Sequence, residues 1–408
     1  MTFWQSPVAY LTQALRGLLE GTGMSALAVA LIMDLIGSVL LVGGALLVVI
    51  FLIWLERKIL ARIQDRLGPN RVGPFGVFQT FADLVKIVTK ELITPEGADK
   101  VPYNLAPILS VGAVFLLWAV IPLSATVVGL DISVGALYLL AVGSLGVLGM
   151  ILAGWGSHSK FSLLGGFRAA AQLLSYEIPM ALSLLIPVML AGSMRLNAIA
   201  LSQPVWGIVY APIPALIFFV TSIAEVGRAP FDLMEAESEL IAGFNIEYSG
   251  IKFGFFYVAD FLHAFTTAML FSVLFLGGWQ GPAAQQIPVL GFVYFVIKTS
   301  VVYLFSVLVR ATLPRLRIDQ MMNLNWKFFT PLSIGMVMLT ALLGKLLPVN
   351  PGWAQPVGML AANLVVGALA WRYAERAESR PRPEVAPANP PFAHWLPPAS
   401  GGQEGGQA

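Results

Sequence analysis

The apolar stretch ALAVALIMDLIGSVLLVGGALLVVIFLIWL, residues 26–55, decides the fold. It carries a single charge, Asp34, and is longer than the roughly 20 residues that a helix needs to cross the hydrocarbon core of a bilayer. The whole chain has the same character, because 57% of its 408 residues are hydrophobic and 11% are charged. A typical soluble domain has about 25% charged residues. The sequence therefore predicts an all-α, polytopic membrane protein.

Further apolar stretches long enough to span a membrane follow the first one. Together with it they predict about nine transmembrane helices within a domain that covers residues 26–374. Residues 1–25 are expected to form an N-terminal interfacial segment, since Val8, Leu11 and Leu15 recur at helical spacing. Residues 375–408 are rich in Pro, Gly and Ala and are expected to be a disordered tail. The later spans are predicted at 104–124, 133–154, 173–192, 206–227, 251–276, 288–309, 328–347 and 353–374.

A basic segment, ERKILARIQDRLGPNRVGPFG at residues 56–76, follows the first span. After it, residues 75–92 place apolar side chains such as Phe81, Leu84 and Val88 on one helical face, with Asp83 and Lys86 on another. This pattern is typical of an amphipathic helix that lies in the membrane interface rather than across it.

The distribution of Lys and Arg predicts the orientation. One set of alternate loops and the C-terminal tail carries 20 of the 24 basic residues, the opposite set carries three, and Lys298 falls within a span. Because basic residues concentrate on the cytoplasmic side, the N-terminus is expected outside and the C-terminus in the cytoplasm.

Metal and thiol chemistry have little support in the sequence. The absence of cysteine excludes disulfides, thiolate nucleophiles and cysteine-ligated iron–sulfur clusters within this chain. The three histidines, His158, His263 and His394, are far apart in the sequence, so we expect no metal or haem site built by this chain alone.

The stretch EVGRAPFDLMEAESELIAGFNIEY, residues 225–248, holds six of the 22 carboxylates and a single base, Arg228. Asp232 and Glu235 have the spacing of a capping box, which predicts a short helix from Leu233 to about Ala242. On that helix Asp232, Glu235 and Glu239 would share one face. If the face is buried, the carboxyls can exchange protons as a relay; a solvated acidic loop would titrate normally and do nothing.

Charges also fall within or at the ends of the apolar spans. Each costs about 2.5 to 3.5 kcal/mol at the centre of a lone helix, so the side chains are expected to face the helix bundle, water or one another. The alternative for each is a structural pair or a place near the lipid headgroups. These residues are Asp34, Glu177, Glu225, Asp260 and Lys298.

Five motifs, in order along residues 26–347, resemble one family. They are ERKILARIQDRLGPNRVGPFG, FADLVKIVTKE, GWGSHSKFSLLGGFRAAAQLLSYE, AEVGRAPFDLMEAESELIAGFNIEYSG and RATLPRLRIDQ, the last followed by Trp326 and Lys327. Together they are similar to the NuoH-type membrane subunit of respiratory complex I, the proton-pumping NADH:quinone oxidoreductase, whose mitochondrial counterpart is subunit 1.

The resemblance implies a subunit of the bacterial inner (plasma) membrane that forms much of the quinone-access chamber and couples quinone reduction to proton translocation. Its partners would be the other membrane-arm and hydrophilic-arm subunits, together with quinone and the lipid bilayer, and a neighbouring subunit would hold the terminal iron–sulfur cluster. Nucleic acid is not indicated. By the resemblance, the chamber is lined by Arg57, Arg62, Arg66, Asp83, Lys86, Arg228 and Phe231, and the proton relay runs through Glu177, Glu225, Asp232, Glu235, Glu237, Glu239, Glu247 and Asp260.

The chain departs from the family at several positions. Asp260 stands where Glu is usual, and Ile318, Asn323 and Asn325 replace a usual Tyr, Arg and Gly. Two alternatives stay open from the sequence. One is a homologous subunit of a ferredoxin- or coenzyme-F420-linked dehydrogenase or of a membrane hydrogenase, and the other is an independent ion-coupled secondary transporter that uses Glu177 and Lys298.

Overall fold

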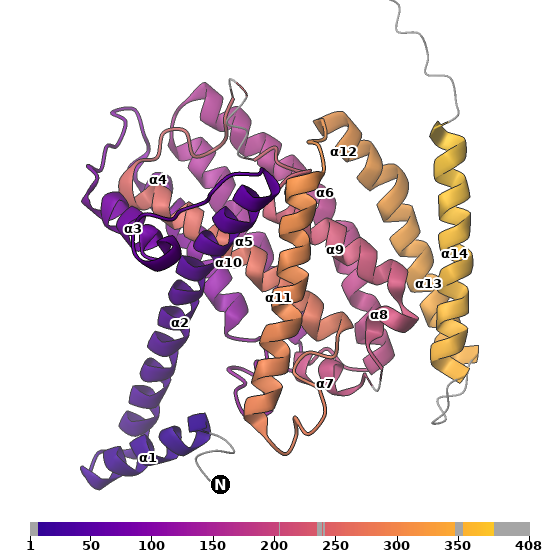
Figure 1. Cartoon of the computed structure of the whole chain (residues 1–408), viewed down its shortest axis with the longest axis horizontal. Helices are drawn as coiled ribbons and strands as arrows, with labels where there is room; N and C mark the ends of the chain where they lie inside the picture. The colour runs from indigo at the N-terminus through magenta and orange to yellow at the C-terminus, as the bar shows by residue number, and fades with distance from the viewer. Residues whose placement is uncertain (1–6, 204, 235–238, 240, 347–353, 379–408) are drawn as a thin grey trace, which may run out of the picture. The chain divides into compact units, whose positions relative to one another are not determined.

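The computed structural model describes residues 7–203, 205–234, 239, 241–346 and 354–378. The elements in this part of the chain are all helices, as the sequence predicts (Figure 1). Contacts divide the chain into two units, residues 1–364 and 365–408, and the contacts described below lie within the first. The helices are α1 (Pro7–Gly21), α2 (Ala26–Ile63), α3 (Gln79–Thr89), α4 (Lys100–Trp118), α5 (Gly135–Gly156), α6 (Lys160–Ala191), α7 (Leu196–Leu201), α8 (Gly207–Tyr210), α9 (Pro212–Val226), α10 (Gly250–Phe275), α11 (Pro288–Thr312), α12 (Ile318–Leu324), α13 (Thr330–Leu346) and α14 (Ala354–Glu378), with a 3-10 turn at Pro74–Gly76 and a π-helical turn at Asn325–Phe329.

Seven helical segments in the described residues are long and apolar enough to cross a membrane, so the chain is a polytopic membrane protein. The predicted span at 206–227 is not among them, because it is divided into α8 and the 15-residue helix α9. The break falls at Ala211, whose backbone (φ −131°, ψ 59°) is not helical, since Pro212 follows it and disfavours the helical region for the residue before it. The predicted span at 353–374 is the helix α14, which is also not among the seven.

The amphipathic helix is real but shorter than its sequence pattern predicts. It begins at Gln79 rather than at residue 75, because Phe75 and Gly76 have positive φ angles of 56° and 75°, which a right-handed α-helix does not contain. It ends at Thr89, where Lys90 turns to extended backbone. In Figure 1 it lies beside α2, and it also packs against α10.

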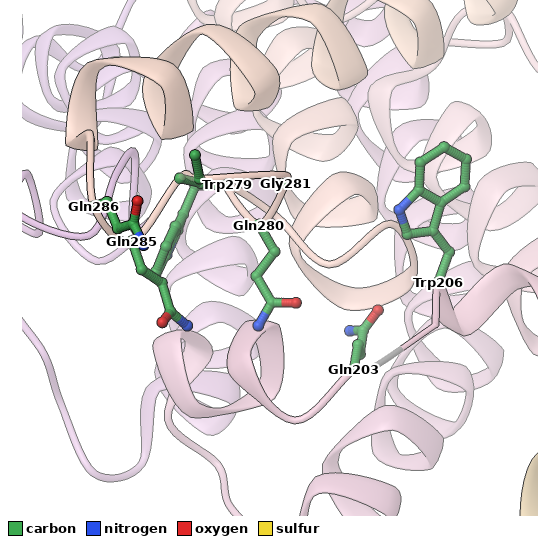
Figure 2. Close-up of a pocket in the computed structure, with 9 residues that line it drawn as sticks. Gln203, Trp206, Trp279, Gln280, Gly281, Gln285 and Gln286 are labelled. Atoms are coloured by element: carbon green, nitrogen blue, oxygen red, sulfur yellow. The ribbon is translucent and has the colours of Figure 1, made fainter.

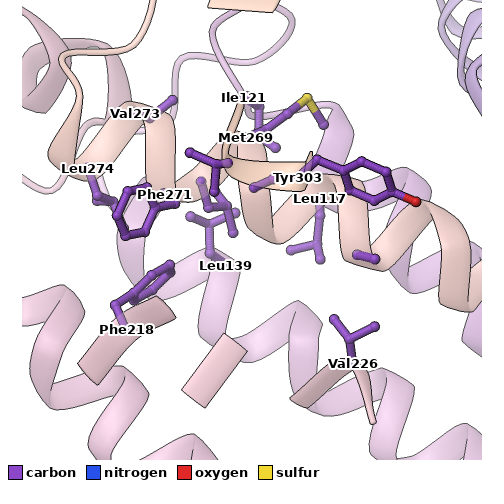
Figure 3. Packing of buried hydrophobic residues seen from close by; sticks show 14 of the residues in the cluster. Leu117, Ile121, Leu139, Phe218, Val226, Met269, Phe271, Val273, Leu274 and Tyr303 are labelled. Carbon is purple, nitrogen blue, oxygen red and sulfur yellow. The ribbon is translucent and has the colours of Figure 1, made fainter. Parts of the chain in front are cut away.

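The core of the bundle forms around α10, most of whose length is buried by α4, α9 and α11. Figure 3 shows part of this packing, where Phe218 of α9 lies against Phe271 of α10. A hydrogen bond crosses the same region, since Nε1 of Trp118 donates to Oγ1 of Thr266 over 2.7 Å. The indole nitrogen is thereby satisfied in an otherwise apolar interior.

Proline inside a helix is accommodated by a donor from elsewhere in the chain. Pro107 in α4 has no N–H to give to the carbonyl of Tyr103, four residues before it. The hydroxyl of Tyr248 donates to that carbonyl instead, over 3.0 Å, and the two tyrosine rings stack with centroids 4.2 Å apart. The end of the acidic stretch is therefore fixed to α4.

The helix predicted from Leu233 to Ala242 falls partly outside the described residues, which omit 235–238 and 240. Where it can be compared, the prediction is wrong: Leu233, Met234 and Glu239 are not helical. The physical reason lies in the two consecutive apolar side chains. Leu233 and Met234 are each 3% exposed and belong to different hydrophobic clusters, so the chain passes between the clusters and buries one side chain in each.

Candidate functional site

An apolar cavity of about 540 Å³ lies between α2, α3, α4 and α10. Most of its wall is aliphatic or aromatic, including Val49 and Ile53 of α2 and Phe115 of α4. Polar and charged side chains also line it, from the start of the basic segment, from the polar side of α3 and from α10. They are Arg57, Thr80, Asp83, Lys86 and Tyr257.

The charged residues of this cavity form one cluster. Nη1 of Arg57 lies 2.6 Å from Oδ2 of Asp83, and Nζ of Lys86 lies 3.3 Å from Oδ1 of the same carboxylate. Partial burial acts to raise the pKa of Asp83, but the hydrogen bonds from Arg57 and Lys86 outweigh it and lower that pKa below its usual value. Asp83 is therefore ionised at neutral pH and holds α3 against α2.

Next to Arg57, the carboxylate of Glu56 is the centre of a second, buried cluster. Glu56 is 2% exposed and accepts hydrogen bonds from Nη1 of Arg228 (2.9 Å), from the hydroxyl of Tyr303 (3.0 Å) and from Nη1 of Arg310. Burial acts to lower the pKa of Arg228, but the negative charge of Glu56 outweighs it and raises that pKa above its ordinary value. The guanidinium of Arg228 also lies 4.7 Å from the centre of the Phe261 ring.

Sequence reasoning found Arg228 but missed Glu56, Tyr303 and Arg310. Glu56 is the first charge after the apolar run and opens the basic motif, which is the signal that could have found it. Tyr303 and Arg310 lie seven residues apart, on one face of α11. Their convergence on Glu56 spans 247 and 254 residues of sequence, which helical periodicity does not reveal.

An acidic pair lies beyond this cluster. Oε1 of Glu177 accepts a 2.6 Å hydrogen bond from the Ser144 hydroxyl, and Glu225 is near enough to interact with it electrostatically. Nε2 of His263 lies 3.8 Å from Oε1 of Glu225, whose side chain is 12% exposed. Arg228 acts electrostatically on His263, so the acidic pair and the Glu56 cluster are neighbours. His263 is a further residue that the sequence did not place in the site.

The other acids named from the sequence have different surroundings. Glu239 is paired with two arginines, Arg168 at 2.8 Å and Arg315 at 2.9 Å. The hydrogen bond from Arg168 is the main reason that the pKa of Glu239 lies below its ordinary value. Asp260 is half-buried and interacts with Arg228. Asp232 and Glu247 are half-buried, and Glu235 and Glu237 lie outside the described residues.

Only some of the residues that the resemblance assigns to the chamber line the cavity. Arg57, Asp83 and Lys86 line the 540 Å³ cavity, whereas Arg62 and Arg66 are exposed and do not line it. Phe231 is 3% exposed, with its ring 5.3 Å from that of Tyr176. Among the described residues there is no group of three or more His, Cys, Asp or Glu side chains placed to hold a metal ion.

A second cavity, of about 440 Å³, lies at the loop between α10 and α11 and has a polar wall of glutamines and tryptophans (Figure 2). Beside it, Nζ of Lys298 donates to the backbone carbonyls of Leu276, Gly278 and Gln280, at 2.7, 3.0 and 2.7 Å. Gln203 is held in a similar way, with its amide nitrogen donating to the carbonyls of residues 273 and 274. Lys298 thus fixes a loop, and its ammonium group is engaged by carbonyl oxygens rather than by the carboxylate of Glu177.

Comparisons with known proteins agree with the motifs. The model of the family described as NADH dehydrogenase matches residues 36–341. The chain is 46% identical over 307 residues to the H subunit of NADH-quinone oxidoreductase from Dehalococcoides mccartyi (strain CBDB1), covering 75% of this chain and 86% of the relative. It is 48% identical over 300 residues to the second H subunit of the same enzyme from Geobacter sulfurreducens, covering 71% and 90%. It is 41% identical over 321 residues to the H subunit from Magnetococcus marinus, covering 78% and 93%.

These relatives confirm the family that the motifs predict. The match begins within α2 and ends within α13, so it includes both charged clusters and the acidic pair. The chain belongs to the NADH dehydrogenase family, as a membrane subunit of NADH-quinone oxidoreductase.

Proposed function

We propose that the cavity between α2, α3, α4 and α10 is the quinone-access chamber, and that this chain couples quinone reduction to proton translocation through an acidic relay. The observation that carries the proposal is the cavity itself, with a long apolar wall and a compact charged cluster of Arg57, Asp83 and Lys86. The name of the relatives, NADH-quinone oxidoreductase, supplies the substrate class.

A quinone has the chemistry that such a cavity fits. Its isoprenoid tail is apolar and matches the aliphatic wall, while its headgroup carries two carbonyl oxygens that accept hydrogen bonds from cationic side chains. An amphipathic helix at the membrane interface provides an entry at the level from which a lipid-soluble substrate arrives. In this role α3 is one wall of the portal, and its charged side faces the interior.

The proposed relay starts at the buried Glu56 cluster and ends at the acidic pair. Arg228 contacts Glu56 and acts electrostatically on His263, His263 lies 3.8 Å from Glu225, and Glu225 interacts with Glu177. A charge change at the quinone end therefore has a short route, through ionisable groups sheltered from bulk water, to Glu177. Two charges at a given separation interact more strongly in a protein interior than in water, because the effective dielectric constant is lower.

Glu239 has a different role in this proposal. Two arginines hold it ionised at neutral pH, so it fastens the acidic loop to α6 and to the segment after α11 rather than carrying protons. Asp232, Glu235, Glu237, Glu247 and Asp260 remain proposed members of the relay on the resemblance.

The chain contains no cysteine, so it holds no cysteine-ligated iron–sulfur cluster, and we propose that neighbouring subunits hold the terminal cluster and the electron donor site. We propose that its N-terminus faces outward and its C-terminus faces the cytoplasm of a bacterial inner membrane, on the basis of the Lys and Arg distribution. The natural lack of cysteine permits a direct test. A cysteine in place of Arg66 is expected to react with an impermeant maleimide only from the cytoplasmic side, and one in place of Gln285 only from the outside.

The relay is tested with Glu225→Gln in the intact complex reconstituted into vesicles. The expected result is normal NADH oxidation with a soluble artificial electron acceptor, which reports assembly, but quinone-linked turnover lowered by one to two orders of magnitude. Glu20→Gln, at an exposed position paired with Arg16, is the control and keeps full turnover. Normal turnover with a normal number of protons pumped per electron in Glu225→Gln would remove this residue from the relay.

A further inference from the structure

Pro179 creates a backbone defect in α6 at the position of Glu177. Proline has no N–H, so the carbonyl of Ser175, four residues earlier, loses its helical donor. Both residues are buried, and water does not reach this carbonyl freely. A buried carbonyl without a donor is unfavourable, and helices bend at such points unless another group fills the position.

Asn325 provides the missing donor from a distant part of the chain. Its Nδ2 lies 2.5 Å from the carbonyl oxygen of Ser175, and the side chain is 0% exposed. Asn325 opens the π-helical turn between α12 and α13, a local widening of the helix. The turn thereby brings an amide side chain to the proline defect of α6.

A second contact fixes the same two segments. The hydroxyl of Tyr176, the residue after Ser175, donates to the carbonyl of Met321 over 3.0 Å. The Asn325 bond therefore runs from the π-helical turn to α6, and the Tyr176 bond runs from α6 to α12. The buried amide oxygen of Asn325 has no hydrogen-bond partner among the described residues, so packing alone does not explain an asparagine here.

Glu177 lies within the segment that these bonds hold. It is two residues after Ser175 and two before Pro179, and its carboxylate accepts the hydrogen bond from Ser144 of α5. The direction of the Glu177 side chain therefore depends on how α6 bends between residues 175 and 179.

We propose that Asn325 is a positioning residue for Glu177, acting by giving the carbonyl of Ser175 the hydrogen bond that Pro179 cannot give. The proposal rests on the proposed function, in which Glu177 belongs to the proton relay. Tyr248 and Pro107 form the same arrangement in α4, which shows that this chain fills a proline defect with a side-chain donor at another site as well.

The test compares Asn325→Leu with the double variant Asn325→Leu, Pro179→Ala in the intact complex. Leucine has a similar volume but no donor, so quinone-linked turnover is expected to fall about tenfold, because small misplacements of a reacting group are costly. The pH at which turnover is half-maximal is expected to move by roughly half a unit. Alanine at position 179 restores the backbone N–H, so the double variant is expected to regain most of the turnover and the original pH profile.

Two further variants serve as controls for Asn325→Leu. Asn323→Leu, at an exposed position near the end of α12, two residues before Asn325, is the control for the same substitution beside the turn. Asn325→Ala introduces no larger side chain and is measured in parallel, so that a failure of Asn325→Leu to assemble does not decide the result. Assembly is followed throughout by NADH oxidation with a soluble acceptor.

An unchanged pH profile and turnover in Asn325→Ala, or a loss that Pro179→Ala does not reverse, would overturn the positioning role. Glu177→Gln separates this failure from that of the relay. If Glu177→Gln leaves turnover and pumping unchanged, the proposed relay is wrong at this residue; if it impairs them while both Asn325 variants behave normally, only the positioning role is wrong.

Discussion

Three donors converge on the buried carboxylate of Glu56, and they come from two elements far away in the sequence. Arg228 follows α9, and Tyr303 and Arg310 belong to α11. The buried carboxylate is stable there because two guanidinium groups compensate its charge and, with the Tyr303 hydroxyl, donate hydrogen bonds to it. The cluster therefore fastens α2, α9 and α11 at one point beside the cavity.

Glu56→Gln is expected to destabilise the protein strongly. The substitution leaves the buried Arg228 and the half-buried Arg310 beside a neutral amide. Breaking a buried ion pair in this way costs on the order of 3–5 kcal/mol. The measurement is the thermal stability of the detergent-solubilised complex, with the loss of this chain from the complex on heating as the readout. Glu20→Gln, which breaks only an exposed ion pair with Arg16, is expected to change stability by about 1 kcal/mol or less. Equal stability of the two variants would contradict the account of this cluster.

The pKa of Asp83 gives a prediction about pH. Hydrogen bonds from Arg57 and Lys86 lower this pKa, so the carboxylate and its stabilising contacts are fully present above the ordinary Asp value of about 3.9 and are lost only as pH falls through the lower folded value. Asp83→Asn is therefore expected to reduce quinone-linked turnover by the same factor at pH 5.5 and at pH 8.0. A defect that disappears at pH 5.5 would mean that Asp83 is already protonated there.

Of the seven residues that the resemblance assigned to the chamber, Arg57, Asp83 and Lys86 line the cavity, and the partners of the buried groups were not predicted. The amphipathic pattern of residues 75–92 placed Asp83 and Lys86 together, because both lie on one turn of a single helix. Glu56 and His263 were missed, because their partners lie on other helices and no local periodicity connects them. Glu177 and Glu225 stood out by composition alone, as charges in apolar stretches.

Among the elements, α3 decides the shape of the cavity. It packs against α2 and α10, and Gly254 of α10 permits the close approach, since a Cβ at this position would lie 2.9 Å from Cγ2 of Ile87. The apolar side of α3 and the wall from α2 leave space between them, where Val49 lines the cavity and is 2% exposed. A larger apolar side chain at position 49 would extend into the proposed chamber without changing any charge.

Val49→Trp is expected to raise the apparent KM for quinone about tenfold or more, because the indole fills part of the space that the quinone needs. The matched control is Leu47→Trp, two residues away on α2, where the side chain is 63% exposed and does not line the cavity. Both variants are assayed for quinone-linked turnover over a range of quinone concentrations. Similar KM values for Val49→Trp and the unsubstituted protein would argue that the cavity is not the chamber.

The helices themselves were largely predictable, since apolar length and helical periodicity are properties of contiguous sequence. The exceptions have local causes. The span at 206–227 breaks because Pro212 excludes Ala211 from the helical region, and α3 starts late because Phe75 adopts a positive φ. The helix predicted after Asp232 failed because two consecutive buried side chains, Leu233 and Met234, outweighed a favourable capping pattern.

Across the whole molecule, the cavity, the Glu56 cluster and the acidic pair form a series of neighbouring charged groups, joined partly by direct contacts and partly by electrostatic interaction. Asp83 binds Arg57, whose neighbour Glu56 binds Arg228, and Arg228 acts on His263 beside Glu225. Composition predicted the membrane fold, and the resemblance of five motifs predicted the family, which the comparisons confirm. The convergence of these groups is a tertiary property, because their contacts join residues up to 254 positions apart.

Photoaffinity labelling determines whether quinone occupies the cavity between α2, α3, α4 and α10. The intact complex is illuminated with a quinone analogue that carries a photoreactive group on its ring, and the labelled peptides are identified by mass spectrometry. If quinone occupies this cavity, labels are expected on residues 49–57 and 80–88 and on α10 near Tyr257, and they are expected to disappear when excess unmodified quinone is present. Labelling of this chain only elsewhere, for example at the polar cavity of Gln203 and Trp279, or labelling that unmodified quinone does not displace, would contradict this expectation.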